Sequence, residues 1–130
     1  MKSIHVVAAI IVKENKVLVA KRRYGEFAGK WEFPGGKVEQ NETNEQALIR
    51  EIFEELNIII STDKYLLTVN YDYSKFHISM DCYLCNILNN KIELKEHSEV
   101  MWLLLDEIAL LDLLPADVLV LEKLKSLINV

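Results

Sequence analysis

The sequence predicts an α/β (α+β) fold in a single domain, residues 1–130. Runs rich in β-branched and apolar residues are interrupted by helical patterns, which indicates a sheet covered by helices. A length of 130 residues is typical of one domain, and no repeat, low-complexity tract or Pro/Gly/Ser-rich linker divides the chain. A composition of 51% hydrophobic and 27% charged residues is that of a globular protein.

Each element follows from its local pattern. Strands are expected at Ile4–Val12, Val17–Lys21, Tyr65–Tyr73, Phe76–Leu88 and Val100–Leu105. Thr43 and Gln46 have the spacing of a capping box, which predicts a helix over Thr43–Leu56. Asn57 tolerates the left-handed conformation that ends such a helix. Asp106–Leu111 and a helix from about Pro115 to Leu127 close the chain.

Charge and hydropathy exclude several classes of function. A formal net charge of -5 argues against a nucleic-acid polymer as partner, and less strongly against a nucleotide. The apolar run Val6–Val12 is too short to cross a bilayer, and no cleavage site follows it, so we expect a cytoplasmic protein without a membrane partner. No obligate protein partner is evident.

Cys82 and Cys85 are separated by two residues, a spacing found in zinc and redox sites. The segment Lys75–Asn86 reads as a strand, however, and residues three apart on a strand point to opposite faces of the sheet. There is no second cysteine pair, and the histidines lack ligand spacing. We expect both to be structural thiols.

The helix over Thr43–Leu56 has two chemically distinct faces. One arc holds the predicted core stripe, Leu48, Ile49, Ile52, Phe53 and Leu56. Another arc holds Glu51, Glu54 and Glu55 within one turn. A solvated acidic face would explain the cluster on its own. The carboxylates lie in the C-terminal half of the helix, however, where the helix dipole disfavours negative charge, and this favours a metal site.

Gly35 and Gly36 precede this acidic helix and follow a proline. Paired glycines allow backbone conformations closed to other residues, so a carbonyl can turn toward a ligand, although a simple turn is the alternative. Carboxylates together with a carbonyl form an all-oxygen set suited to Mg²⁺ or Mn²⁺. Because Mg²⁺ favours phosphate as a further ligand, the pattern points to a phosphorylated substrate.

The spacing of these residues resembles a known signature. Gly36 is followed after five residues by Glu42, and after seven more by the run Arg50–Ile58. This resembles the Nudix box, G-x5-E-x7-R-E-U-x-E-E-x-G-U, in which U is aliphatic. One position departs, because Asn57 stands where the family has glycine. The remainder resembles the MutT-type branch over nearly the whole chain, most weakly in its C-terminal third.

The resemblance implies a fold and an activity. The fold would be an α/β/α sandwich with a mixed sheet and a catalytic loop and helix. The activity would be Mg²⁺-dependent hydrolysis of a nucleoside triphosphate to the monophosphate and pyrophosphate, with CTP, dCTP derivatives or 8-oxo-dGTP as candidate substrates. Mn²⁺ is an alternative metal. A non-catalytic nucleotide-sensing module, or hydrolysis of another nucleoside diphosphate derivative, are the alternative functions.

The resemblance also implies roles for individual residues. The metal would be held by the Gly35 carbonyl and the carboxylates of Glu51, Glu54 and Glu55. Arg50 would orient a glutamate of this cluster, and Glu42 would support the loop. Glu51 is the first candidate for general base, with Glu96 and Glu99 as alternatives. Arg23, with Arg22 or Lys37, would face the phosphates.

Base recognition is expected near the end of the chain. Asp117 matches a position where MutT-type enzymes contact the base, although a role as a first-turn acid of the helix is equally compatible with the sequence. Tyr73 and Phe76 flank a turn between two strands and are candidates for stacking on the base. Packing of the two rings against each other is the alternative.

Overall fold

The structure is a computed structural model that describes residues 1–89 and 91–128 of the chain. Its strands are β1 (Lys2–Lys13), β2 (Lys16–Arg22), β3 (Trp31–Glu32), β4 (Gly35–Lys37), β5 (Ile60–Asp72), β6 (Phe76–Ile87) and β7 (His97–Leu103). Its helices are α1 (Asn44–Leu56), α2 (Leu105–Ile108) and α3 (Pro115–Leu127). Each strand and helix predicted from the sequence is present, but β5 begins at Ile60 and β7 at His97, several residues earlier than expected. The short strands β3 and β4 were not predicted.

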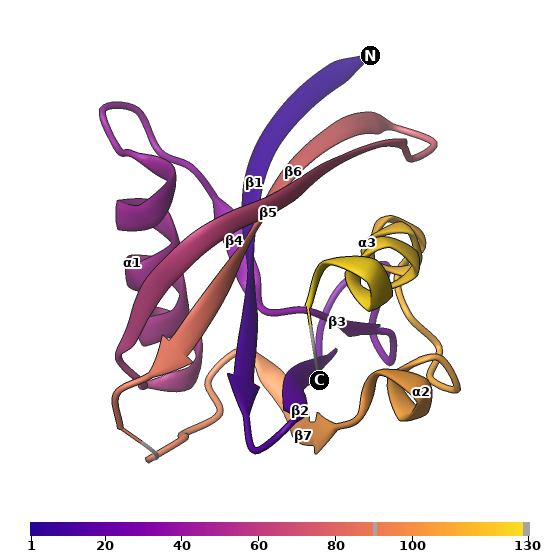
Figure 1. Ribbon diagram of the computed structural model, residues 1–130. Coiled ribbons are helices and arrows are strands. Elements are labelled where there is room, and N and C mark those ends of the chain that lie inside the picture. The colour runs from indigo at the N-terminus through magenta and orange to yellow at the C-terminus, as the bar shows by residue number, and fades with distance from the viewer. Residues whose placement is uncertain (90, 129–130) are drawn as a thin grey trace.

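The sheet is mixed, as the resemblance implied. Strand β1 runs parallel to β6, from the pair Lys2↔Phe76 to the pair Ile11↔Cys85, and β6 pairs antiparallel with β5. The short strand β4 lies antiparallel to the middle of β1. The end of β1 turns into β2, which pairs with β3 and β7. Strand β1 therefore joins the two halves of the sheet (Figure 1).

Helices cover both faces of this sheet, which confirms the three-layer sandwich. Helix α1 lies on one side, and α2 and α3 lie on the other (Figure 1). Alternate residues of β1 serve the two cores: Val7 and Ile11 pack with α1, whereas Ala8 and Ile10 pack with α3. Cys82 and Cys85 are buried in different cores, so they do lie on opposite faces. Burial raises the pKa of both thiols, to about 12 for Cys85.

Both predicted ends of α1 are present. The Thr43 side chain accepts a hydrogen bond from the Gln46 N–H (3.1 Å), and the Gln46 side chain accepts one from the Thr43 N–H (2.9 Å). Asn57 is left-handed with φ 58°, and its N–H donates to the Phe53 carbonyl (2.9 Å). Local side-chain chemistry therefore defines where the helix begins and ends.

The predicted core stripe of α1 was wrong at two positions. Ile49 and Phe53 are 39% and 49% exposed, and the buried residues of the helix are Ala47, Leu48, Ile52 and Leu56. At about 100° per residue, this buried arc is displaced toward the side that carries Glu51 and Glu55. The helix therefore turns those two glutamates toward the sheet.

Helix α3 turns part of its apolar surface to solvent. Val118 and Leu127 are 39% and 40% exposed. The buried stripe of this helix consists of Ala116, Asp117, Val120, Leu121 and Leu124. A carboxylic acid thus occupies a buried position in the first turn.

Gly35 and Gly36 do not adopt the backbone conformations reserved for glycine that the sequence suggested. The left-handed glycines are Gly25 and Gly29, whereas Gly35 and Gly36 are part of β4. A Cβ on Gly35 would lie 1.9 Å from the Val7 carbonyl oxygen. A Cβ on Gly36 would lie 2.2 Å from Glu51 Oε2. The paired glycines are needed for close approach of β4 to β1 and to α1.

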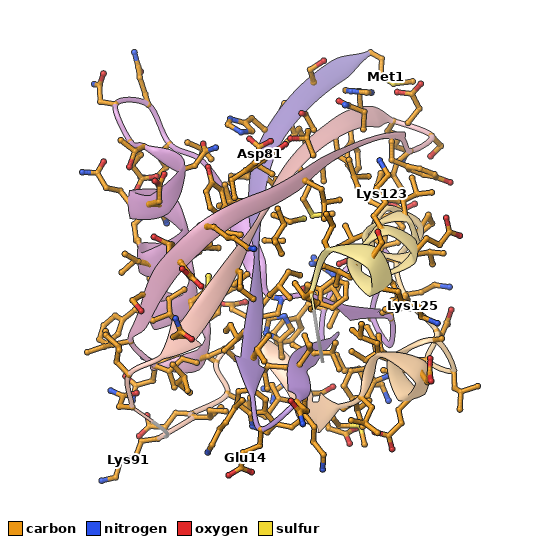
Figure 2. The ribbon with its side chains drawn as sticks, viewed as in Figure 1. Met1, Glu14, Asp81, Lys91, Lys123 and Lys125 are labelled. Atoms are coloured by element: carbon orange, nitrogen blue, oxygen red, sulfur yellow. The ribbon has the colours of Figure 1, made fainter. Side chains whose placement is uncertain are left out.

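A polar cluster on Asp81 attaches the start of α1 to the sheet (Figure 2). The Asp81 carboxylate accepts hydrogen bonds from His5 Nε2 (2.7 Å), Asn44 Nδ2 (3.0 Å) and Thr68 Oγ1 (2.5 Å). These donors come from β1, α1 and β5, and their hydrogen bonds lower the pKa of Asp81 against the opposing effect of its burial. The cluster holds the end of α1 that follows the glycine strand.

Replacement of Gly35 by alanine should destabilise the fold severely. The new Cβ would overlap the β1 backbone, which cannot move without breaking the β1–β6 pairing. We expect a loss of about 2–4 kcal/mol in the free energy of unfolding, measured by urea titration. Gly25→Ala is the control: its Cβ meets open space, and its positive φ should cost only about 1 kcal/mol. Equal stability of the two variants would contradict the packing argument.

Candidate active site

One cavity of about 770 Å³ brings together the residues singled out from the sequence. Its walls come from β1, the loop after β2, the strands β3 and β4, helix α1, the turn between β5 and β6, the segment before β7, and the start of α3. Nine of the predicted site residues line it: Arg23, Gly35, Lys37, Glu51, Glu54, Glu55, Tyr73, Phe76 and Asp117. Arg22 and Glu96 line it as well, whereas Glu42, Arg50 and Glu99 do not. Arg50 lies behind this wall and contacts the glutamates.

The guanidinium of Arg50 organises the acidic end of the cavity. It donates to Glu42 Oε2 (2.6 Å), to Glu51 Oε1 (2.8 Å) and to Glu54 Oε1 (3.2 Å). A further bond reaches the Lys37 carbonyl (3.1 Å), which links α1 to β4. These bonds raise the pKa of Arg50, principally through Glu42, and hold the pKa of Glu42 at about 2. Arg50 therefore contacts two glutamates of α1 and pairs with Glu42 from the preceding loop.

Glu55 occupies the most unusual electrostatic position. Burial, with the neighbouring charges of Glu32 and Glu51, raises its pKa to about 9. Glu96 adds to this effect, and only Arg22 opposes it among the main contributors. Negative charge therefore outweighs positive charge around Glu55, and a bound divalent cation would favour the ionised form of this carboxyl group.

The acidic end offers oxygen donors but no complete metal site made of protein side chains. Among the described residues, no group of three or more His, Cys, Asp or Glu side chains is placed to hold a metal ion. Glu51 and Glu54 are instead bonded to Arg50. Mg²⁺ binds through one or two carboxylates and completes its shell with water and substrate phosphates, so an open acidic cluster is compatible with it. Glu51, Glu54, Glu55 and the Gly35 carbonyl are the groups that would hold it.

Positive charge borders this acidic end. Arg23 is exposed, and its Nη2 donates to the His97 carbonyl (3.1 Å), while Lys37 is exposed at the end of β4. Arg22 is committed elsewhere, because its Nη1 bonds both oxygens of Glu32 (3.0 and 3.2 Å). Of the basic residues named from the sequence, Arg23 and Lys37 are therefore the ones with charge exposed to a ligand.

The opposite end of the cavity is aromatic. Tyr73 stacks on Phe76 with ring centroids 5.1 Å apart, and its other neighbours are Phe27 at 5.3 Å and Tyr71 at 4.7 Å. The Tyr73 hydroxyl accepts a hydrogen bond from the Ala116 N–H (3.1 Å), and burial raises its pKa to about 12. Tyr73 and Phe76 thus pack on each other and also line the cavity. Phe27 was not predicted, since the basic loop that carries it has no regular pattern.

Asp117 is buried at the base of this aromatic end and is 4% exposed. Its Oδ1 accepts a hydrogen bond from the Phe33 N–H (2.9 Å), so it tethers α3 to the segment between β3 and β4. Burial, with Glu32 nearby, raises the pKa of Asp117 well above its ordinary value. Asp117 is also the acidic residue in the first turn of α3, the alternative position expected for it, and the N-cap of the helix is Leu114. A carboxyl group here can accept a hydrogen bond, and in its protonated form it can also donate one.

Two further residues of the cavity were not among those predicted. The negative charge of Glu32 raises the pKa of two carboxyl groups, Glu55 and Asp117. His97 is 2% exposed, and its Nε2 lies 2.9 Å from Glu32 Oε2. The sequence carried no signal for this contact, because the two residues meet only where β2 pairs with β3 and β7.

Comparison with known proteins identifies the family. The NUDIX domain model matches residues 2–124. The CTP pyrophosphohydrolase of Escherichia coli K12 is 37% identical over 128 residues, which cover 98% of this chain and 95% of that protein. The 8-oxo-dGTP diphosphatase of Proteus vulgaris is 40% identical over 99 residues, which cover 75% of this chain and 88% of that protein. The chain therefore belongs to the Nudix family.

Solved structures agree with this assignment. The solution structure of the Escherichia coli ORF135 protein superposes with a TM-score of 0.84 at 36% identity, over 98% of this chain and 91% of that one. The crystal structure of a MutT Nudix hydrolase from Burkholderia pseudomallei gives 0.82 at 29% identity, over 95% and 98%. Within the family, the chain is a Nudix hydrolase of the MutT type. Across residues 1–89 and 91–128, each helix is too short or too polar to cross a membrane.

The ion pair between Glu42 and Arg50 should make stability depend on acid pH. An unfolded glutamate has a pKa of about 4.3, and the folded value is about 2. Because the folded pKa is the lower one, the stabilisation is complete above the unfolded value and is lost as pH falls from about 4 to about 2. Glu42→Gln should therefore unfold at a lower urea concentration than the wild type at pH 7, with the difference shrinking below about pH 4.

The control for this titration is Glu122→Gln, which removes an exposed carboxylate on α3. It should follow the wild-type stability across the whole pH range. A Glu42→Gln deficit that stays constant from pH 7 to pH 2 would mean that the ion pair does not account for the loss.

Proposed function

We propose that this Nudix hydrolase, acting as a single domain over residues 1–130, cleaves nucleoside triphosphates to the monophosphate and pyrophosphate with Mg²⁺ or Mn²⁺. The observation that carries the proposal is the order of chemistry along one cavity: carboxylates on α1, exposed basic side chains beside them, and an aromatic end with Asp117. A nucleoside triphosphate has a matching order of metal-binding phosphates, negative charge and a flat base. The relatives named above act on CTP and 8-oxo-dGTP, which supports this substrate class.

The residues divide the reaction between them. A bound divalent ion would neutralise charge on the phosphates and lower the pKa of an attacking water. Glu51 is proposed as the general base that accepts the proton of that water, and Arg50 keeps its carboxylate in place. Arg23 and Lys37 bind the phosphates that carry the developing charge. The bond that breaks is the anhydride between the α- and β-phosphates, and pyrophosphate leaves.

The nucleoside end is proposed to bind the base by stacking and by hydrogen bonding. Tyr73 and Phe76 supply a flat apolar surface, with Phe27 behind Tyr73. Asp117 offers a carboxyl group whose Oδ1 already holds the Phe33 N–H. The remaining oxygen is available to a polar edge of the base, which supports cytosine derivatives or oxidised guanine as substrates.

The test is release of pyrophosphate in the presence of Mg²⁺ from a panel of nucleotides. The panel contains CTP, dCTP, 5-methyl-dCTP, dGTP, 8-oxo-dGTP, ADP-ribose and a dinucleoside tetraphosphate. We expect turnover of one or more triphosphates, with monophosphate as the second product. Glu54→Gln should reduce that turnover on the order of a hundredfold or more without unfolding. Glu45→Gln, an exposed glutamate in the first turn of the same helix, should keep it.

Each outcome of the panel is informative. Turnover of ADP-ribose or the dinucleotide alone would keep the hydrolase and overturn the triphosphate assignment. Tight nucleotide binding without any turnover would favour a sensing module. Near-normal activity of Glu54→Gln would remove this glutamate from the metal site.

Asp117→Ala should change the ranking of triphosphates in that panel. The substitution removes the only proposed hydrogen-bonding side chain at the nucleoside end, so the preferred base should lose the most kcat/KM. It also leaves the buried Phe33 N–H without its acceptor, at a cost of about 1–3 kcal/mol in stability. Asp117→Asn is the control for the fold, because its amide oxygen can still accept from Phe33. An unchanged ranking in Asp117→Ala would place Asp117 outside base recognition.

A further inference from the structure

The cavity contains a buried contact between His97 and Glu32 that takes no part in the proposed reaction. His97 is the first residue of β7, and its side chain is almost completely inaccessible to solvent. An ionised carboxylate only accepts hydrogen bonds, so the His97 Nε2 carries the proton and donates to Glu32 Oε2 (2.9 Å). Both residues line the large cavity. The contact is therefore part of the site and not of a distant core.

Glu32 is the central negative charge of the cavity. Its carboxylate is held by three hydrogen bonds, two from Arg22 Nη1 and one from His97. It acts electrostatically on Glu55 at the acidic end and on Asp117 at the aromatic end. Movement of the Glu32 side chain would change the electrostatic potential at both Glu55 and Asp117. The hydrogen bonds that hold Glu32 therefore influence both ends of the cavity.

His97 contacts a second functional side chain through its backbone. The His97 carbonyl accepts a hydrogen bond from Arg23 Nη2 (3.1 Å), and Arg23 is the exposed cation proposed to bind phosphate. In sheet register, His97 pairs with Arg22 across β7 and β2, where the register shifts between Lys21 and Arg22. The irregular pairing places the His97 ring on Glu32 and its carbonyl on Arg23.

One ring nitrogen of His97 destabilises the folded state. Its Nδ1 is buried and has no hydrogen-bond partner in the part of the chain that the structure describes. A buried polar atom without a partner is unfavourable, and an apolar side chain of similar size would avoid that penalty. Packing alone therefore does not explain a histidine at this position, whereas the bond to Glu32 does.

Resting on the proposed function, we propose that His97 is a positioning residue for nucleotide binding. Its ring holds the Glu32 carboxylate in one orientation, and its carbonyl holds the Arg23 guanidinium. One residue thus holds both the Glu32 carboxylate and the Arg23 side chain that is proposed to meet the phosphates. His97 does not touch the reacting atoms and takes no part in the chemical step.

The test compares two amides at position 97. Glutamine places an N–H near the position of the histidine Nε2 and can keep the bond to Glu32, whereas asparagine places it near Nδ1 and cannot. His97→Asn should raise KM for the best triphosphate of the panel by about tenfold, with kcat changed by less than about threefold. His97→Gln should stay within about threefold of the wild type in both constants. His5→Asn removes another histidine–carboxylate contact, outside the cavity, and should behave as the wild type.

A double-mutant cycle separates positioning from a general effect on the fold. If His97 acts through Glu32, the cost of His97→Asn should largely disappear in a Glu32→Gln background. The same four proteins should also be compared by their affinity for CMP, measured by calorimetry in the absence of metal. This version of the cycle does not require turnover. Circular dichroism of each variant confirms that it is folded.

The outcomes distinguish this proposal from the proposed function. If the wild type hydrolyses no triphosphate, the proposed function fails, and CMP binding by the four proteins of the cycle still decides the role of His97. Equal KM and CMP affinity for His97→Asn and His97→Gln, additive effects of His97→Asn and Glu32→Gln, or absence of CMP binding to the wild type would each overturn the positioning role.

Discussion

The ion-pair cluster around Arg50 is the interaction on which the acidic end of the site depends. One guanidinium holds carboxylates from the loop before α1 and from the helix itself, and it also bonds the carbonyl of Lys37 in β4. Without it, three carboxylates within one helical turn would repel each other in a partly buried setting. The cluster holds Glu51 and Glu54 on one guanidinium, and at the same time it ties the helix to the glycine strand.

The close approach of that strand is the complementary constraint. Gly36 leaves no room for a side chain because Glu51 passes directly beneath its backbone, and Gly35 leaves none because of β1. The position of Glu51 is therefore fixed from below by Arg50 and from above by the strand. In this chain, close backbone contacts therefore constrain the spacing between the paired glycines and Glu51.

Prediction from sequence succeeded where the determining interactions are local. The capping box at Thr43 and the left-handed Asn57 depend on neighbours within one turn, so α1 was placed to within one residue. The strands β3 and β4 are short and exist because distant segments pair with them, as Trp31 does with Leu113. Their residues have no strand pattern of their own, and no reading of local sequence identifies them.

The errors at the site have a physical cause as well. The apolar arc of α1 was read from hydrophobicity alone, and Ile49 and Phe53 were included in it. The helix is rotated so that the side bearing Glu51 and Glu55 faces the sheet, and Ala47 takes part in the buried face in place of Ile49 and Phe53. The contact between His97 and Glu32 joins residues that are remote in sequence. Only the assembled sheet brings them together, so no motif contains them.

The parallel pairing of β1 with β6 has a consequence for how the protein is made. The first strand of the chain has its long partner in a strand that is synthesised only after α1 and β5. A ribosome would therefore release the glycine strand and the acidic helix well before their supporting sheet exists. Pairings of such long sequence separation form slowly, because much of the chain must be ordered before they stabilise it. During this interval the apolar residues of β1 would be exposed in the nascent chain, where they can aggregate or bind chaperones. Pairing with the completed β6 would bury them.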